Sequence, residues 1–436
     1  MTLFGAPTGE MSHWLWSSAA VLLFAVVCRL SLRPRGRAAV TACDVLVVYA
    51  SQTGQAEAIA RRSQAELAAG GIEARVASLV KISPADMAAA KTILFVASTT
   101  GDGDAPDDAR AFEARWFDTR PDLSGQTFAV LALGDRKYDP FCAFGLRLHA
   151  WLEACGAKPL GPCLTADDLD RDTLDQWEMQ VAHLGGTATA AEAPPPLWTL
   201  ETRERLNPGG PSPLFRLTFS ALEPQSWAAG DLVEVVTRDG HLRDYSIASL
   251  PQEGHLSLYV REVRSPEGLL GHGSGLLLYD MEPGDTIGLR LKTHVGFHAP
   301  AGDGQLLLIG AGSGLAGLRP HILSSGKRKA WVVYGERHPL RDGALVRELE
   351  ALQNDGTIAR LSLAFSQPDA GDGRYVQDGL AAEGARVCDH LIHDGAVMVC
   401  GGLDMGRAVE KALRRLMGDA WTDRAITDGR YRRDLY

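Results

Sequence analysis

Hydrophobic and polar positions follow more than one period along this chain. Near-continuous apolar runs occur at Asp44–Ala50, Thr92–Ala97 and Thr127–Leu133, and a helical pattern follows the first of them. An apolar run without alternation is typical of a strand that is buried on both faces of a parallel sheet. We therefore predict an α/β domain with a parallel sheet over residues 44–187.

The pattern changes after an Ala/Pro-rich stretch at residues 188–196, which we interpret as a linker. The next apolar runs are short and separated by turn residues, which favours a small antiparallel β-barrel over residues 197–300. These runs are Leu214–Phe219, Leu232–Thr237, His255–Val263 and Asp285–Leu291. Apolar strands that lead into glycine-rich or polar loops return in residues 301–436, so we predict a second α/β domain there.

The N-terminal segment Ser12–Leu32 is largely apolar, and Arg29 is its single charged residue. It is long enough for a membrane span if Arg29 reaches the interface, and Trp14 and Trp16 stand where interfacial anchors do. Arginines follow the segment and no Lys or Arg precedes it. We therefore predict a single transmembrane helix at residues 12–32, in the inner membrane, with the catalytic domains facing the cytoplasm. A cleaved signal peptide and a buried N-terminal helix remain as alternatives.

Composition and charge narrow the class of protein. At roughly 150 residues per domain, a chain of 436 residues suggests two or three domains. Hydrophobic residues make up 45% and charged residues 22%, which excludes a mainly disordered chain, a collagen-like repeat and a polytopic membrane protein. A net charge of -10 argues against nucleic acid as the partner, because the phosphate backbone requires a basic face. The seven cysteines include no CxxC pair, which fits a reducing compartment.

Loops rich in hydroxyl, glycine and acidic residues follow the three strands of the first predicted domain. They read SQTGQAE at Ser51–Glu57, STTGDGDAPDDA at Ser98–Ala109 and LGDRKYDPF at Leu133–Phe141. Ligands of open parallel sheets bind at the carboxyl ends of the strands, so these loops are expected to form one site. The first loop opens a helix, whose N–H groups and dipole suit a phosphate group.

The three loops resemble the phosphate loop and the two ring-contacting loops of flavodoxins, and in particular those of the FMN domains of diflavin reductases. The resemblance implies that Ser51–Ala56 hold the FMN phosphate and that Tyr138 stacks on the flavin ring. Taken alone, Tyr138 would be explained as an ordinary surface tyrosine. Thr100 stands where the family often has an aromatic residue, so one face of the flavin is expected to be less covered. The implied FMN-binding residues are Ser51, Gln52, Thr53, Gly54, Gln55, Ala56, Thr99, Thr100, Gly101, Gly134, Tyr138 and Phe141.

Acidic residues are concentrated in the first domain. Residues 44–187 hold 21 acidic and 13 basic side chains, a net of -8 within the total of -10. Four of the acids lie in the second loop: Asp102, Asp104, Asp107 and Asp108. Two interpretations stay open, a solvated face of the ordinary kind and a docking surface for a basic electron-acceptor protein.

The barrel segment contains Arg243-Asp244-Tyr245-Ser246 and, downstream, a Gly/Ser-rich helix start at Gly268–Leu277. A fixed guanidinium and such a helix start suit a pyrophosphate. The pair resembles the FAD-binding barrel of ferredoxin–NADP reductases. The resemblance implies that Arg243 binds the FAD pyrophosphate, that Tyr245 stacks on the ring and that Ser246 lies near its reactive nitrogen. Gly271, Gly273 and Ser274 would continue the phosphate site; the tetrapeptide alone would also fit a salt bridge beside a core tyrosine.

The last segment resembles the NADP(H) module of the same reductases from end to end. Gly310–Ala316, with Gly312 and Gly314, would face the nicotinamide pyrophosphate. Arg337, Ser366, Arg374 and Tyr375 would surround the adenosine and its 2′-phosphate. The implied catalytic residues are Ser246, Cys400, Asp434 and Tyr436, with Tyr436 stacked on the FAD face that the nicotinamide must reach. A buried strand thiol and a frayed terminus are the plain alternatives for Cys400 and Tyr436.

The sequence is therefore identified as resembling the diflavin reductases over residues 44–436, a family that includes the sulfite reductase flavoprotein subunit and the NADPH–haemoprotein reductases. It implies FMN, FAD and NADPH as cofactors, no metal site, and a one-electron acceptor such as a haem protein, a sulfite reductase haem subunit or an iron complex. Gln367 stands where the family usually has Arg, so NADH use stays open. An NADH-dependent flavin or ferric reductase and a non-catalytic flavin-binding sensor are the alternatives.

Overall fold

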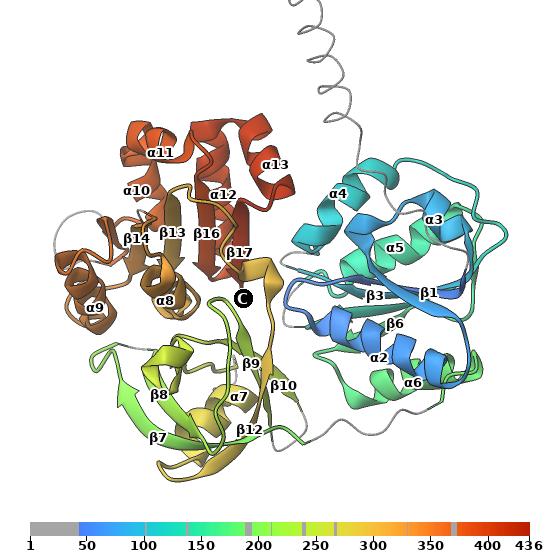
Figure 1. Cartoon of the computed structure of the whole chain (residues 1–436), viewed down its shortest axis with the longest axis horizontal. Helices are drawn as coiled ribbons and strands as arrows, with labels where there is room; N and C mark the ends of the chain where they lie inside the picture. The colour runs from blue at the N-terminus through green and yellow to red at the C-terminus, as the bar shows by residue number, and fades with distance from the viewer. Residues whose placement is uncertain are drawn as a thin grey trace, which may run out of the picture.

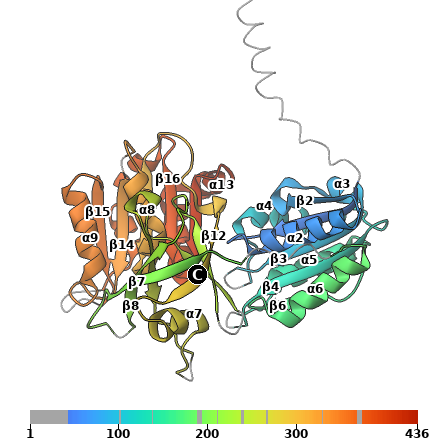
Figure 2. The ribbon, with the colours of Figure 1, turned by 60° about the horizontal axis from the view of Figure 1, so that its bottom comes forward.

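The computed structural model describes residues 43–100, 103–136, 139–187, 194–210, 212–237, 241–265, 268–328, 330–367 and 373–436. Within these ranges the strands form three sheets, and each sheet defines one unit of the molecule. We refer to residues 43–187 as the N-terminal unit, 194–300 as the barrel unit and 301–436 as the C-terminal unit. The N-terminal unit lies beside the other two, and the C-terminus lies where the three units meet (Figures 1 and 2).

The N-terminal unit is a parallel sheet of strand order β2-β1-β3-β4-β5, with β6 also paired to β4. Its strands are β1 (Cys43–Ala50), β2 (Ala74–Ser78), β3 (Ala90–Ser98), β4 (Thr127–Gly134), β5 (Lys158–Pro159) and β6 (Leu164–Asp167). Its helices are α2 (Gln55–Ala69), α3 (Pro84–Ala88), α4 (Asp107–Trp116), α5 (Ala143–Ala154) and α6 (Arg171–His183).

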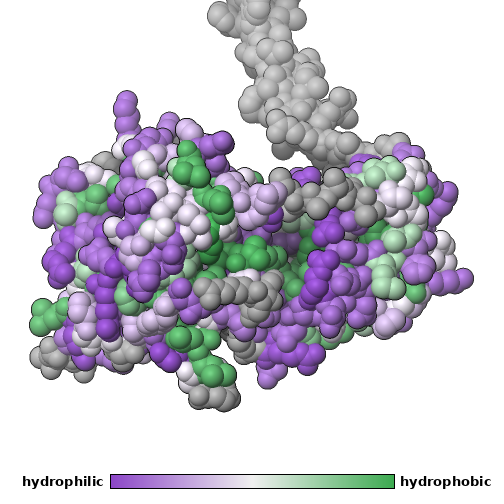
Figure 3. Space-filling view, turned by 90° about the horizontal axis from the view of Figure 1, so that it is seen from below, coloured by the Kyte–Doolittle hydropathy of each residue, from purple (hydrophilic) through white to green (hydrophobic). Residues whose placement is uncertain are grey.

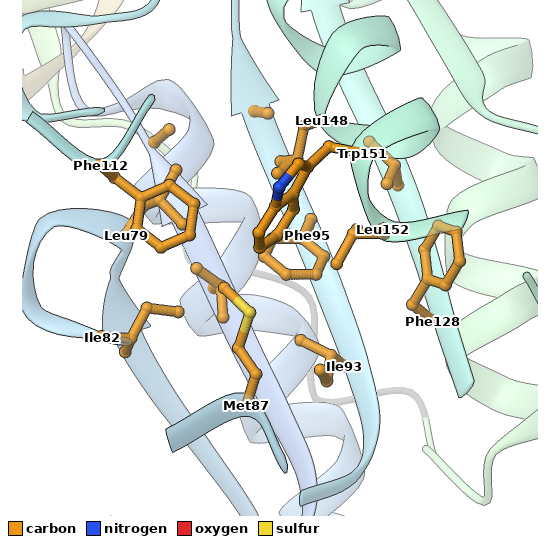
Figure 4. Close-up of a cluster of buried hydrophobic side chains, with 14 of the residues drawn as sticks. Leu79, Ile82, Met87, Ile93, Phe95, Phe112, Phe128, Leu148, Trp151 and Leu152 are labelled. Carbon is orange, nitrogen blue, oxygen red and sulfur yellow. The ribbon is translucent and has the colours of Figure 1, made fainter. Parts of the chain in front are cut away.

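Helices cover both faces of this sheet, which explains its unbroken apolar strands. Helices α2 and α6 pack on one face through Leu67 and Trp177. Helices α3, α4 and α5 cover the other face, where Phe95 and Trp151 lie in one cluster (Figure 4). Burial of apolar surface at roughly 25 cal/mol per Å² is the main force that holds these layers together.

The barrel unit is an antiparallel sheet of order β10-β9-β12-β7-β8-β11. Its strands are β7 (Leu197–Arg205), β8 (Leu214–Ala221), β9 (Leu232–Val236), β10 (Leu242–Ser246), β11 (Leu256–Arg261) and β12 (Thr286–Lys292). A short helix α7 (His272–Gly275) runs into a π-helical turn, Leu276–Asp280, whose leucines close the core of the barrel.

The C-terminal unit is a parallel sheet of order β15-β14-β13-β16-β17. Its strands are β13 (Leu306–Ala311), β14 (Ala330–Glu336), β15 (Arg360–Phe365), β16 (Ala396–Gly401) and β17 (Tyr431–Leu435). Helices α8 (Leu315–Ser324) and α9 (Gly343–Asn354) pack on the face toward the barrel, with which they share a core. The other face carries α10 (Val376–Ala382), α11 (Gly384–Leu391), α12 (Leu403–Met417) and α13 (Asp419–Thr427).

The prediction of a transmembrane helix, and with it of a single-pass inner-membrane protein, is wrong for the chain as described. From Cys43 onward, across the described ranges, no helix is long and apolar enough to cross a membrane. The longest of these helices have 15 residues, whereas a span needs roughly 20 apolar ones. The predicted segment, residues 12–32, lies outside the described residues.

Candidate functional site

A cavity of about 310 Å³ opens at the carboxyl ends of β1, β3 and β4. The chain turns sharply between β1 and α2 at Gly54, whose φ of +88° is favourable for glycine. The Ser51 hydroxyl accepts a hydrogen bond from the Gly54 N–H at 2.9 Å and fixes the turn. The first turn of α2 therefore lies at the cavity, where its unpaired N–H groups suit an anion.

The lining of this cavity fits a flavin nucleotide. The Thr99 hydroxyl is buried and has no hydrogen-bond partner among the residues that the structure describes. Buried hydroxyls are normally paired, so this one indicates a polar ligand. The predicted FMN residues that line the cavity are Gln52, Thr53, Gln55, Thr99, Thr100 and Gly134.

Among the residues that the structure describes, four other predicted FMN residues are not part of this lining: Ser51, Gly54, Ala56 and Phe141. Ala56 is fully buried in the core under α2, and Phe141 packs against the Arg136 guanidinium at 4.6 Å. Gly101 and Tyr138 lie outside the described residues.

A second group of predicted residues lies between β10 and α7 in the barrel unit. A Cβ atom at Gly273 would stand 2.5 Å from the Tyr245 hydroxyl and 2.9 Å from Arg243 Cγ, so only glycine permits this approach. Gly271 precedes α7, and the Ser274 hydroxyl accepts a hydrogen bond from a backbone N–H at 3.2 Å. A guanidinium next to a glycine-rich helix start fits a pyrophosphate.

In this arrangement Arg243 is also engaged by the N-terminal unit. Its Nη1 donates to Asp168 Oδ1 at 2.8 Å, and its Nη2 donates to Asp168 Oδ2. Asp168 has a left-handed φ of +53°, which directs it out of the loop after β6. Two parallel N–H···O bonds make this a strong and geometrically specific pair.

The C-terminal unit contains a larger cavity, of about 650 Å³. Glycine is required beside it, because a Cβ atom at Gly314 would lie 2.1 Å from the Cys400 carbonyl oxygen. The predicted nucleotide residues that line it are Gly312, Arg337, Ser366, Arg374 and Tyr375. Arg337 and Arg374 give this cavity the positive charge that a phosphorylated nucleotide needs.

The predicted catalytic side chains meet at the junction of the barrel and the C-terminal unit. The Ser246 hydroxyl donates to Asp434 Oδ2 at 2.7 Å, and the Cys400 thiol lies 3.6 Å from the same oxygen. Cys400 is fully buried and Asp434 is 4% exposed. Burial, with the charge of Asp434, raises the pKa of the Cys400 thiol well above its ordinary value. Cys400 is therefore a neutral thiol that donates to Asp434, not a thiolate nucleophile.

Native Cys400 is accordingly expected to resist iodoacetamide at pH 8.5, because only the thiolate reacts and burial disfavours it. Peptide mass spectrometry after a timed quench should find this cysteine unmodified in the folded protein and modified after denaturation in urea. Cys388 in α11 is partly exposed and is the internal control. Rapid alkylation of Cys400 without unfolding would contradict the neutral, buried thiol.

Tyr436 is held in place at the end of β17 and is not a frayed terminus. Its N–H donates to the Gly401 carbonyl at 3.2 Å and its hydroxyl donates to Ser313 Oγ at 2.9 Å. Its side chain lines both cavities and is 51% exposed. Tyr436 thus stands between the smaller cavity of the N-terminal unit and the larger cavity of the C-terminal unit.

Several residues at these cavities were not predicted from the sequence. Arg261, which ends β11, lines the larger cavity, while Arg407 of α12 and Arg433 of β17 line the smaller one. Each reaches its cavity from a unit or element remote in sequence. The motifs assign no role to these arginines, so only the three-dimensional arrangement identifies them.

The comparisons with known proteins agree with this geometry. Residues 47–179 match the flavodoxin family. The chain is 27% identical to the sulfite reductase [NADPH] flavoprotein alpha-component of Thiocapsa roseopersicina, over 85% of this chain and 83% of that protein. It is 22% identical to the protein of that name from Bacillus subtilis, over 90% of this chain and 89% of the relative. The corresponding protein of Vibrio cholerae is 23% identical, over 89% and 87% respectively.

The N-terminal unit is therefore a flavodoxin domain, joined to an antiparallel barrel and a second parallel sheet. The chain is homologous to the sulfite reductase flavoprotein alpha-component and, with it, to the diflavin reductases. The family resemblance read from the motifs is confirmed.

Proposed function

We propose that this protein is an NADPH-dependent diflavin reductase of the sulfite reductase flavoprotein type. Residues 44–187 bind FMN, residues 188–196 link the domains, residues 197–300 bind FAD and residues 301–436 bind NADPH. The observation that carries the proposal is the position of Tyr436, which lines both cavities beside the Ser246–Asp434–Cys400 cluster. The relatives, which are named as NADPH-linked flavoproteins, support the same cofactors.

Each cofactor has its own set of residues in this proposal. The loop Ser51–Gln55 and Thr99 hold FMN, and the chemistry of Arg243, Tyr245 and the α7 helix start supports FAD binding. The larger cavity takes NADPH, with the guanidinium groups of Arg337 and Arg374 at the 2′-phosphate. When bound at these residues, the flavins would supply the chemistry that links a two-electron hydride donor to a one-electron acceptor.

The chain itself positions the cofactors and contributes a cluster of buried and half-buried polar side chains. Asp434 accepts a hydrogen bond from the Ser246 hydroxyl, which fixes the Ser246 oxygen at the barrel face. The neutral Cys400 thiol donates to the same carboxylate oxygen of Asp434. Tyr436 must leave its position for the nicotinamide to reach the barrel, and its half-exposed side chain, anchored by Ser313, is suited to such a movement.

The proposed acceptor is a protein with a one-electron haem or iron centre that docks on the acidic N-terminal unit. Residues 44–187 carry a net charge of -8, which would steer a basic partner. Electron transfer to such a partner should therefore slow as ionic strength rises. If the rate is insensitive to salt, the acidic surface is an ordinary solvated face.

The decisive experiment measures the flavins and their reduction in the purified full-length chain. Extraction should yield one FMN and one FAD per chain, and both should bleach when NADPH is added without oxygen. Flavin that neither NADPH nor NADH reduces would instead identify a flavin-binding sensor. The intact Ser246–Asp434–Cys400 cluster argues against that second function.

Replacement of Gln367 by Arg is expected to shift the preference for NADPH over NADH about tenfold, the low end for a hydrogen bond to a charged group. Gln367 is exposed beside Ser366, and its backbone N–H donates to the Arg337 carbonyl oxygen at 2.7 Å. The ratio of kcat/KM values for the two nucleotides reports the shift. Gln353→Arg in α9, outside the cavity, is the matched control. An equal change in this variant would mean that the net charge of the protein, and not the charge at position 367, sets the preference for NADPH.

A further inference from the structure

A side chain of the barrel unit reaches the larger cavity of the C-terminal unit. Arg261 ends β11 and lines this cavity, whereas the other lining residues among those that the structure describes belong to residues 311–436. In the view from below, the barrel and the C-terminal unit form one continuous body, and a hollow with hydrophobic side chains lies between it and the N-terminal unit (Figure 3). The larger cavity is therefore completed by a residue from outside its own sheet.

The guanidinium of Arg261 lies against the glycine-rich loop that follows β13. A Cβ atom at Gly312 would stand 2.9 Å from Arg261 Nη2, and Gly312 has a left-handed φ of +57°. Glycine is thus favoured here for its backbone conformation and for the space that the guanidinium occupies. This places the cation at the start of Gly312–Gly314, in the loop expected to face the pyrophosphate of the nucleotide.

Arg261 is held at this loop from the barrel side. Its Nη1 donates to the Ser212 carbonyl oxygen at 3.1 Å, and a carbonyl oxygen fixes the side chain without neutralising its charge. Two residues earlier in β11, Tyr259 packs into the core that the barrel shares with α8 and α9. The Tyr259 hydroxyl also lies 3.2 Å from Glu348 Oε2 of α9, to which it donates. The position of the guanidinium relative to Gly312 is therefore set by packed structure.

The lining of the larger cavity carries charges of both signs. Its arginines are Arg261, Arg337 and Arg374, and its acids are Glu336 and Asp404. Burial raises the pKa of Glu336, while a hydrogen bond from the Tyr334 hydroxyl at 2.7 Å and the charge of Arg261 oppose that rise. Asp404 is exposed in the first turn of α12. Three cations against two acids leave the lining net positive, which suits a phosphorylated ligand.

The three arginines stand at the ends of different strands. Arg261 lies at the loop after β13, Arg337 follows β14, and the backbone N–H of Arg374 donates to the carbonyl oxygen of Phe365, which ends β15, at 2.7 Å. Strand β14 lies between β13 and β15. At about 4.8 Å per strand, the two outer loops are roughly 10 Å apart. The cavity therefore offers cations at two separate places, and NADPH carries a pyrophosphate and a separate 2′-phosphate.

We propose that Arg261 is a further nucleotide-binding residue of the larger cavity, which contacts the pyrophosphate of NADPH beside Gly312. This inference rests on the proposed function, because it takes NADPH as the ligand of the cavity. A guanidinium binds phosphate oxygens through charge-assisted N–H donors. NADPH and NADH share the pyrophosphate, so Arg261 raises the affinity for both nucleotides and leaves the choice between them to the residues at the 2′-phosphate.

The test compares NADP⁺ with adenosine 2′-phosphate, which keeps the 2′-phosphate and lacks the pyrophosphate. Isothermal titration of the full-length holoprotein gives both dissociation constants. Arg261→Gln is expected to weaken NADP⁺ about tenfold, the low end for a lost hydrogen bond to a charged group. The affinity for adenosine 2′-phosphate should stay within about twofold, because charges roughly 10 Å apart are strongly screened. Arg261→Lys, which keeps the charge, should recover most of the NADP⁺ affinity.

Arg264→Gln is the matched control, because Arg264 is an exposed arginine of the same segment that pairs with Glu262 and does not line the cavity. Equal losses for NADP⁺ and adenosine 2′-phosphate in Arg261→Gln would mean that the arginine only supports the shape of the cavity, and would overturn the inference. Unchanged NADP⁺ affinity would also overturn it. If the wild-type protein binds neither ligand, the proposed function itself is wrong, which distinguishes the two failures.

Discussion

Asp434→Ala should slow the reduction of the bound flavins by NADPH about a hundredfold, the low end of what a positioned proton-handling group contributes. Asp434 is 4% exposed and accepts the Ser246 hydroxyl at 2.7 Å, with the Cys400 thiol at 3.6 Å. Without the carboxylate, the Ser246 hydroxyl loses its fixed orientation, and the buried Cys400 thiol loses its acceptor as well. Small displacements of groups around the reacting atoms have large effects on rate.

Anaerobic stopped-flow measurement of flavin bleaching checks this expectation. The limiting rate should fall while the NADPH concentration for half-saturation stays within about twofold, because Asp434 lies away from the cavity lining that binds the nucleotide. Asp428→Ala, in the exposed turn before β17, is the matched control. A variant that loses flavin or NADPH affinity would reveal a purely structural Asp434, and an unchanged rate would remove it from the mechanism.

Buried apolar strands could be predicted from the sequence because both of their faces are covered. The run Asp44–Ala50 corresponds to β1, and the run Thr127–Leu133 corresponds to β4. Strands with mixed burial were missed. The charged β7 has exposed and buried positions in no simple alternation, and the five residues of β10 are all half-buried.

The terminal strand β17 shows why pattern alone fails at a junction of units. Its residues read Tyr-Arg-Arg-Asp-Leu, yet Arg433 and Asp434 are almost fully buried. They are buried because Glu410 compensates one and the Ser246 hydroxyl pairs with the other, and both partners come from distant parts of the chain. Motifs placed Asp434 in the site, whereas the position of Arg433 at the smaller cavity depends on how the units dock.

Contacts between units could not be predicted from the sequence either. Arg243 was predicted as a cofactor ligand, and its own motif contains no sign of a partner in the N-terminal unit. The structure joins Arg243 and Asp168 through a two-pronged ion pair across 75 positions of sequence. Local patterning describes each loop separately and contains no information about which loops will face each other after docking.

Arg243→Gln is expected to produce the largest loss of cofactor, with FAD affinity about a hundredfold lower, the upper range for a hydrogen bond to a charged group. A guanidinium can bind a pyrophosphate through two parallel N–H groups, which glutamine cannot reproduce. Arg243 Cγ stands 2.9 Å from the position of a Cβ on Gly273, so the aliphatic part of the side chain lies at the start of α7 and the guanidinium extends from there to Asp168. Fluorescence titration of FAD into the apoprotein measures the loss.

Asp168→Asn should act in the opposite direction, because Asp168 and the FAD pyrophosphate use the same guanidinium. Loss of the carboxylate frees Arg243 from its partner in the N-terminal unit, so FAD should bind as tightly as in the wild type or a few-fold more tightly. The same substitution removes a contact between units, and small-angle scattering should show a larger radius of gyration. A single variant would thus loosen the docking of the flavodoxin domain without weakening FAD.

The two substitutions together separate the roles of this ion pair. Arg264→Gln, at an exposed arginine of the barrel that pairs with Glu262, is the matched control for loss of charge. If Arg243→Gln retained FAD while expanding the molecule as Asp168→Asn does, the guanidinium would serve docking alone. The FAD phosphates would then have to bind elsewhere, since the α7 helix start would lack the cation that makes it a pyrophosphate site. Opposite signs for the two variants would instead mean that FAD binding and domain docking compete for Arg243.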